Sequence, residues 1–218
     1  MASAPSPASF IDKPIKFGTD GWRGLIAADF TFGRVAHVAG IAAQVLSQQF
    51  ADTGSNTVIV GYDRRFLSPE FARVAADAIA QRGFDVLLST SYAPTPAFSW
   101  AAKANGALGA IVITASHNPA AYSGLKIKGA FGGSVSPEVT KQVEALLDQP
   151  APTGMTPGTL NTFDPWPSYC DGIRAKVDIE AIRAAVSSGQ LTVFTDVMHG
   201  AAATGVGRIL GAPVHELN

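Results

Sequence analysis

The residues whose types are best suited to take part in a reaction lie in the run Ile113-Thr-Ala-Ser-His-Asn-Pro119, which directly follows an apolar stretch. Such a stretch predicts a buried strand, and open α/β sheets bind ligands beyond the carboxyl ends of their strands. There the Ser116 hydroxyl could accept a phosphoryl group, provided that cations and hydrogen-bond donors hold that group. His117 and Asn118 supply donors, and Lys126 could return to the site as a cation or proton carrier. The alternative interpretation of the run is an ordinary turn.

An upstream loop, Phe17-Gly-Thr-Asp-Gly-Trp-Arg-Gly24, combines three glycines with charged residues. The glycines would let the backbone approach a ligand closely, and the Arg23 guanidinium is a candidate fork for a phosphate group. Thr19 and Asp20 are candidate supporting residues of the same phosphate site. A glycine-rich turn that contains only a structural salt bridge is the alternative.

A third loop, Gly61-Tyr-Asp-Arg-Arg65, follows the β-branched run that begins at Thr57. Asp63 and Arg65 would therefore lie at the carboxyl end of a second strand. An Asp–Arg pair in this place most often gives structural support, and a direct role in the chemistry is the alternative.

The elements that would position these loops alternate along the chain. Serine followed by proline at Ser68 and Ser136 indicates the N-caps of two helices. Strands are predicted at 57–61, 84–88 and 108–114, and helices at 33–50, 68–82, 95–105 and 136–148. This alternation predicts an α/β fold, a three-layer α/β/α domain over residues 15–148 with a mixed or parallel sheet, after a disordered start at 1–14.

Residues 149–167 contain five prolines and two glycines, which is the composition of a linker. Beyond it, 168–218 predicts a helix at 178–187, a strand at 190–195, a turn at 196–200, a helix to 210 and a strand at 213–217. One such unit cannot cover both faces of its own sheet, so we expect an incomplete second α/β domain. In the turn, His199 could face a ligand, although packing of the turn is the favoured interpretation.

The composition narrows the classes of partner. The chain has 218 residues, a formal net charge of −1 and 47% hydrophobic residues. A charge near zero gives no basic surface for nucleic acid or anionic lipid, so we expect neither partner. No apolar run approaches the roughly 20 residues that span a bilayer, and the first ten residues lack a secretory signal. The single cysteine, Cys170, fits a reducing compartment, and we expect a cytoplasmic protein.

In order and spacing, four segments of the chain together resemble the first domain of the α-D-phosphohexomutase family. They are Phe17–Gly24, Gly61-x-Asp-x-Arg65, Thr114-Ala-Ser-His-Asn-Pro119 and Tyr122-Ser-Gly-Leu-Lys126. Phosphoglucomutase and phosphomannomutase are its best-known members. The resemblance covers roughly residues 15 to 150. It implies an enzyme of carbohydrate metabolism, an intramolecular phosphotransferase that interconverts hexose 1-phosphate and hexose 6-phosphate through a 1,6-bisphosphate.

The resemblance also implies roles for individual residues. Ser116 would carry the phosphoryl group and ligate Mg²⁺ through its phosphate, and glucose 1,6-bisphosphate would be the activator. Arg23 would hold the phosphoserine, Lys126 would do general acid–base work, and His117 would assist the proton transfer. Asp63 and Arg65 would brace the loop from behind.

The sequence also departs from the family pattern. The Asp-Gly-Asp-x-Asp-Arg-like run that supplies the other Mg²⁺ ligands is absent, as are the loops for the sugar and for the distal phosphate. Ser123 and Leu125 stand where Asn and Phe are usual. We therefore expect a truncated mutase with little turnover alone, whose activity needs the missing C-terminal half in cis or in trans. The alternative is a non-catalytic binding or regulatory module, and preference among glucose, mannose and glucosamine phosphates stays open.

Overall fold

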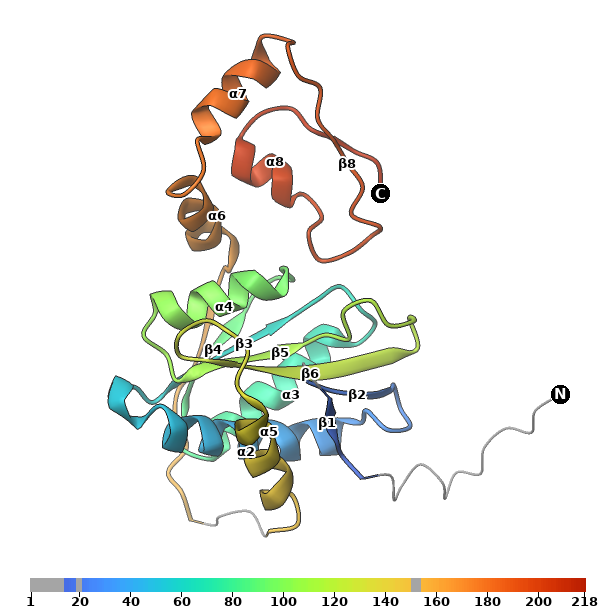
Figure 1. The fold of residues 1–218 in the computed structure, drawn as a ribbon. Coiled ribbons are helices and arrows are strands. Elements are labelled where there is room, and N and C mark those ends of the chain that lie inside the picture. Colours follow the sequence, from blue (N-terminus) through green and yellow to red (C-terminus); the bar gives the residue numbers. More distant parts are fainter. Residues whose placement is uncertain (1–13, 19–20, 150–153) are drawn as a thin grey trace, which may run out of the picture.

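The computed structural model describes residues 14–18, 21–149 and 154–218 (Figure 1). The predicted disordered start, 1–14, lies outside this range except for its last residue. Thr19 and Asp20, two of the predicted supporting residues, also lie outside the described residues.

The described residues form one mixed sheet of seven strands in the order β1-β2-β6-β5-β3-β4-β7. The strands β5, β3, β4 and β7 run parallel, whereas β1, β2 and β6 pair antiparallel along the other side. Their bounds are β1 Phe17–Gly18, β2 Gly21–Leu25, β3 Thr57–Tyr62, β4 Asp85–Ser89, β5 Gly109–Ile113, β6 Tyr122–Gly129 and β7 Leu160–Phe163.

Helices cover both faces of this sheet (Figure 1). On one face lie α2 (Phe32–Gln49), α3 (Ser68–Gln81) and α5 (Pro137–Leu146), with the short 3₁₀ helix η1 (Ala51–Thr53) after α2. Their apolar side chains share one core with the facing strand residues, such as Ile111 and Leu125. On the other face, α4 (Thr95–Ala104) packs against Val112 in a second core. The predicted three-layer α/β/α arrangement with a mixed sheet is thereby confirmed.

The serine loop owes its position to β5, whose five residues are all buried. A uniformly apolar strand can be covered on both faces, which places β5 between β6 and β3 in the interior of the sheet. The carboxyl end of β5 thus lies beside that of β3. The two loops predicted to carry chemistry therefore meet at one edge.

The sequence predicted Ser68 as the N-cap of α3, and this prediction is wrong. The N-cap is Leu67, at φ 60°, and Ser68 is the first helical residue. The Ser68 hydroxyl instead donates a hydrogen bond of 2.9 Å to Asp63 Oδ1. Its binding to the loop after β3 shifts the start of the helix by one residue. At α5 the prediction holds, because Ser136 is the N-cap.

The proline-rich stretch predicted as a linker, 149–167, is not irregular throughout. Its residues Leu160–Phe163 form β7, which pairs in parallel with β4 at the edge of the sheet. The Asp85 carboxylate reinforces this edge by accepting hydrogen bonds from the Thr159 backbone N–H (2.8 Å) and hydroxyl (2.6 Å). The proline-rich composition gave no sign of β7, because this strand forms only by pairing with β4.

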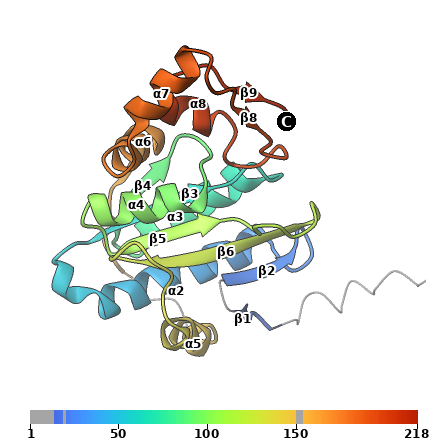
Figure 2. The same cartoon turned by 45° about the horizontal axis from the view of Figure 1, so that its top comes forward.

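The second region comprises α6 (Trp166–Arg174), α7 (Ile179–Ser187), α8 (Gly205–Leu210) and a parallel pair, β8 (Phe194–Thr195) with β9 (His215–Glu216). Figure 2 shows its helices gathered on the α4 side of the sheet, and the buried Trp166 side chain belongs to the same core cluster as Phe98 of α4. The strands predicted at 190–195 and 213–217 shrink to two residues each. No helix in the described part of the chain is both long enough and apolar enough to span a bilayer.

Candidate active site

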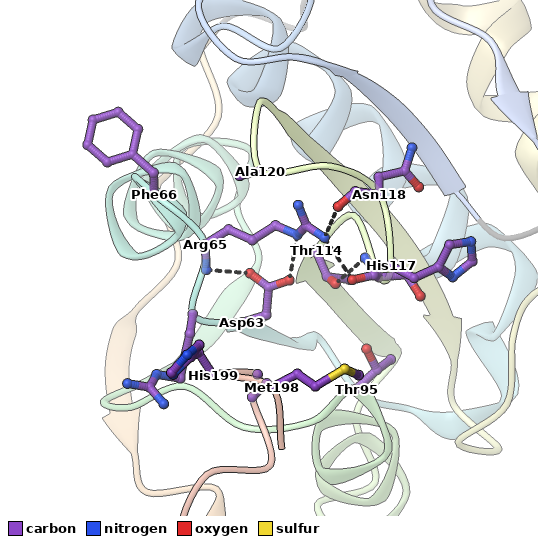
Figure 3. A pocket seen from close by; sticks show the side chains of 14 residues that line it. Asp63, Arg65, Phe66, Thr95, Thr114, His117, Asn118, Ala120, Met198 and His199 are labelled. Carbon is purple, nitrogen blue, oxygen red and sulfur yellow. Dashed lines mark hydrogen bonds and ion pairs between the residues drawn. The ribbon is translucent and has the colours of Figure 1, made fainter. Parts of the chain in front are cut away.

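A cavity of about 610 Å³ opens at the sheet edge where β3 and β5 end (Figure 3). The loops after these strands, the first turn of α4 and the turn at 196–200 all contribute to its wall. The lining residues are Asp63, Arg64, Arg65, Phe66, Thr95, Thr114, Ser116, His117, Asn118, Ala120, Met198, His199, Gly200 and Ala201.

Ser116 is exposed to this cavity in an unusual backbone conformation. Its φ of 58° lies in the left-handed region, which a residue with a side chain adopts only when its surroundings impose it. Thr114 contributes to that constraint, because its Oγ1 accepts a 3.0 Å hydrogen bond from the Ser116 backbone N–H. The hydroxyl is thereby presented to solvent at the end of a buried strand.

Arg65 holds the whole serine loop. Its Nη1 donates to the carbonyl oxygens of Pro119 (3.0 Å) and Tyr122 (3.1 Å), and its Nη2 to those of Ser116 (2.7 Å) and Asn118 (2.8 Å). Its Nε forms an ion pair of 3.3 Å with Asp63 Oδ2. A guanidinium has five N–H donors, so Arg65 has committed all of them. It supports the loop and has no donor left for a ligand.

Asp63 is the counterpart of this clamp. Besides the ion pair, its Oδ1 accepts hydrogen bonds from the Arg65 backbone N–H (3.0 Å) and from the Ser68 hydroxyl (2.9 Å). The carboxylate is thus satisfied from three directions and ties the loop after β3 to the start of α3. The geometry agrees with the predicted bracing role of both residues.

Two other predicted residues lie behind the cavity wall. Arg23, on β2, donates from Nη1 to the Asn118 side-chain oxygen at 2.5 Å, so it reaches the serine loop through its neighbour. Lys126, on β6, is only 7% exposed. It is absent from the cavity lining among the described residues and packs beside Gly21. The structure therefore brings together Ser116, His117 and Asn118, joins Arg23 to them through Asn118, and leaves Lys126 outside the described cavity lining.

Two further residues with polar side chains lie on the opposite wall, and sequence reasoning missed the first of them. Arg64, between the two motif residues Asp63 and Arg65, lines the cavity with its guanidinium 4.9 Å from the centre of the Tyr92 ring. His199 also lines it and is exposed, which favours the ligand-facing interpretation of this histidine over packing of the turn. The only signal for His199 was the turn Asp196–Gly200, whose place over α4 no local pattern reveals.

The described side chains by themselves do not fit a magnesium ion. They contain no group of three or more His, Cys, Asp or Glu residues that could hold a metal. Of the residues that line the described cavity, Asp63 alone is a carboxylate, and it is engaged by Arg65. Magnesium prefers several hard oxygen ligands, which this arrangement does not supply.

These features define a class of protein: a three-layer α/β domain that presents a serine hydroxyl and hydrogen-bond donors at the carboxyl edge of its sheet. Residues 14–153 match the family model described as phosphoglucomutase/phosphomannomutase, alpha/beta/alpha domain I. The chain belongs to the phosphoglucomutase/phosphomannomutase family.

Individual relatives agree with this assignment. The chain is 33% identical to a phosphoglucosamine mutase of Rhodococcus jostii, over 93% of its own length and 45% of the relative's. It is 34% identical to a phosphoglucomutase of Staphylococcus saprophyticus, over 68% and 27% of the two lengths. A solved structure from Thermus thermophilus, described as a phosphomannomutase, superposes with a TM-score of 0.80 at 35% identity and covers 94% of this chain and 46% of its own. The chain thus spans less than half of each of these relatives.

Proposed function

We propose that Ser116 accepts a phosphoryl group from a hexose bisphosphate and returns it to a hexose monophosphate, as the first domain of a phosphohexomutase. The observation that carries this proposal is the presentation of Ser116: an exposed hydroxyl in a left-handed backbone, fixed by Arg65, at the mouth of a cavity lined with donors. Phosphoryl transfer depends mostly on positioning and on charge stabilisation, and this loop provides the first of these.

In the proposed step, the Ser116 Oγ forms a bond to phosphorus while the bond between phosphorus and the sugar oxygen breaks. The proton of the serine hydroxyl leaves, and the sugar oxygen gains one. His117, which is exposed and lines the cavity, is our first candidate to carry that proton, and the buried Lys126 on β6 is the second. In the reverse direction the same groups exchange roles.

Arg23, Asn118 and Arg65 have distinct tasks in this proposal. Arg23 orients Asn118, whose amide is on the cavity wall, and adds positive charge near the phosphoserine. Arg65 holds the backbone from behind, because its donors are committed to the carbonyl oxygens of the loop. Glucose 1,6-bisphosphate is the donor that we expect to load Ser116.

The test is phosphoryl transfer to the purified chain. The protein is incubated with glucose 1,6-bisphosphate, and intact mass spectrometry with peptide mapping locates any added phosphoryl group. We expect one group on Ser116 and none after Ser116→Ala. Ser187→Ala, at an exposed serine on α7 outside the cavity lining, is the matched control and should be labelled like the parent. A chain that stays unlabelled, or that is labelled equally after Ser116→Ala, would contradict the proposal.

A further inference from the structure

Two neighbouring arginines of one loop, Arg64 and Arg65, differ in whether the N–H donors of their guanidinium groups remain available to a ligand. Arg65 spends every donor on the serine loop and on Asp63. Arg64 is exposed at the same cavity, and its guanidinium makes no hydrogen bond or ion pair with any residue that the structure describes. Its contact is the face of the Tyr92 ring, 4.9 Å away. Stacking of this kind fixes the plane of a guanidinium and leaves its edge free to bind an anion.

The turn that carries His199 is held in a strained form. Met198 and His199 follow one another with φ values of 48° and 57°, both in the left-handed region. The Asp196 Oδ1 stabilises the turn by accepting a 2.9 Å hydrogen bond from the Met198 N–H, and the Gly200 N–H donates to the Val197 carbonyl at 2.7 Å.

The placement of the strained residues points to the same cavity. Of the six non-glycine residues with positive φ in the described chain, three line it: Ser116, Met198 and His199. Strain of this kind concentrates at ligand-binding and catalytic sites. The turn therefore presents His199 to whatever occupies the cavity.

The charge balance of the lining indicates the chemistry of that occupant. Among the described lining residues, the only carboxylate is Asp63, which Arg65 already neutralises. Arg64 is then an uncompensated cation, and His199 adds an imidazole without a hydrogen-bond partner among the described residues. A planar fork and an imidazole on one wall match the oxygens of a phosphate group.

We propose that Arg64 and His199 form a phosphate-binding pair, one residue from each region of the chain, on the wall that faces Ser116. The pair deepens the proposed function and rests on it, since it would hold a phosphate group inside the same cavity. Two sources of that group share this chemistry: a small phosphorylated ligand, or the phosphate carried by Ser116 itself. In either case the pair links the first domain to the turn of the second region through an anion.

The first arm of the test removes the serine, so that its outcome does not depend on phosphoryl transfer. Inorganic phosphate and glucose 6-phosphate are titrated into the Ser116→Ala chain by calorimetry. Adding Arg64→Ala or His199→Ala should weaken binding about tenfold each, because each variant loses a charge-assisted or polar contact. The matched controls are Arg73→Ala on α3 and His215→Ala on β9, neither of which lines the cavity, and both should bind like the parent. Arg64→Lys keeps the charge without the fork and should bind with intermediate strength.

The second arm tests whether the pair binds the phosphate carried by Ser116 itself. The chain with intact Ser116 is phosphorylated, and its thermal unfolding midpoint is compared with that of the unphosphorylated protein. If the pair holds the phosphoserine, phosphorylation raises the midpoint in the parent and in the two controls but not in Arg64→Ala or His199→Ala. The proposal is overturned if neither phosphate binding in the first arm nor stabilisation in the second depends on Arg64 and His199. Failure of Ser116 to accept phosphate would leave the first arm fully informative.

Discussion

At the scale of single residues, the serine loop depends on one largely buried guanidinium. Arg65 bonds to four carbonyl oxygens of a loop whose central residue is in the left-handed region, and its ion pair with Asp63 joins that loop to α3. Both side chains of the pair are only 14% exposed. The conformation of Ser116 is therefore set largely by a residue 51 positions away.

We predict that Arg65→Ala destabilises the protein by about 3 kcal/mol, because it leaves a largely buried carboxylate without its partner. Phosphorylation of Ser116 should also become at least tenfold slower, since the loop is no longer fixed. Urea unfolding and the rate of phosphoryl uptake measure the two effects. Arg73→Ala removes an exposed ion pair on α3 and should change stability by less than about 0.5 kcal/mol. Equal effects of the two substitutions would show that Arg65 is not the clamp.

His117 gives a second prediction at this scale. His117→Ala should slow phosphorylation of Ser116 by about 100-fold if the imidazole carries the proton. The unfolding midpoint should stay unchanged, because the side chain is exposed. His215→Ala, at another exposed histidine, is the control. An unchanged rate for His117→Ala would instead favour Lys126 as the proton carrier.

At the scale of elements, the helices and strands that the sequence predicts are those whose burial gives them a recognisable pattern of apolar residues. The stretch that forms β5 is apolar throughout, and the apolar residues that recur at helical spacing in α2, such as Val35, Val38 and Leu46, are buried. The strand β6 was not predicted, because Lys126 and Lys128 in it suggest exposure. Both are nevertheless 7% exposed. Their burial depends on the sheet around them and cannot be deduced from the segment alone.

The attachment of β7 should depend on pH. Hydrogen bonds from the Thr159 side chain and backbone lower the pKa of the Asp85 carboxyl below its ordinary value of 3.8. In the window between the lowered and the ordinary pKa, the unfolded chain binds more protons, so stability rises with pH there. The contribution is complete above the ordinary pKa and is lost as the pH falls through the lowered one. Thr159→Val should flatten this part of the stability profile, measured by urea unfolding between about pH 2 and 5, whereas an unchanged profile would contradict the assignment.

The residues of the site, like the elements of the fold, fall into those that the sequence alone predicts and those that depend on tertiary packing. Ser116, His117 and Asn118 were predictable because one contiguous motif contains them, and Asp63 and Arg65 because they follow a recognisable strand. Arg64 was missed, since its neighbours carry the motif and its own role depends on Tyr92 beneath it. The place of His199 in the cavity lining could not be deduced, because the position of its turn depends on how the second region packs.

At the scale of the whole molecule, the chain spans 27% to 45% of the length of the curated relatives compared above. We predict that the 218-residue chain by itself interconverts hexose 1-phosphate and hexose 6-phosphate at least about 100-fold more slowly than a full-length family member. The reason is that the described residues contain no group of three or more metal-ligating side chains, and the cavity lining holds a single carboxylate, Asp63, which Arg65 engages. A coupled assay of the purified chain measures this, and turnover near that of a full-length enzyme would refute it.

The central claim is that Ser116 carries a phosphoryl group, and the most direct measurement is the intact mass of the protein isolated from its own cells, with peptide mapping. We predict a mass increased by one phosphoryl group, located on Ser116, whatever the length of the native product. A product much heavier than 22.5 kDa with this modification would also show that the sequence is part of a longer mutase. A native protein without phosphate on Ser116, which also stays unmodified after incubation with glucose 1,6-bisphosphate, would contradict the account.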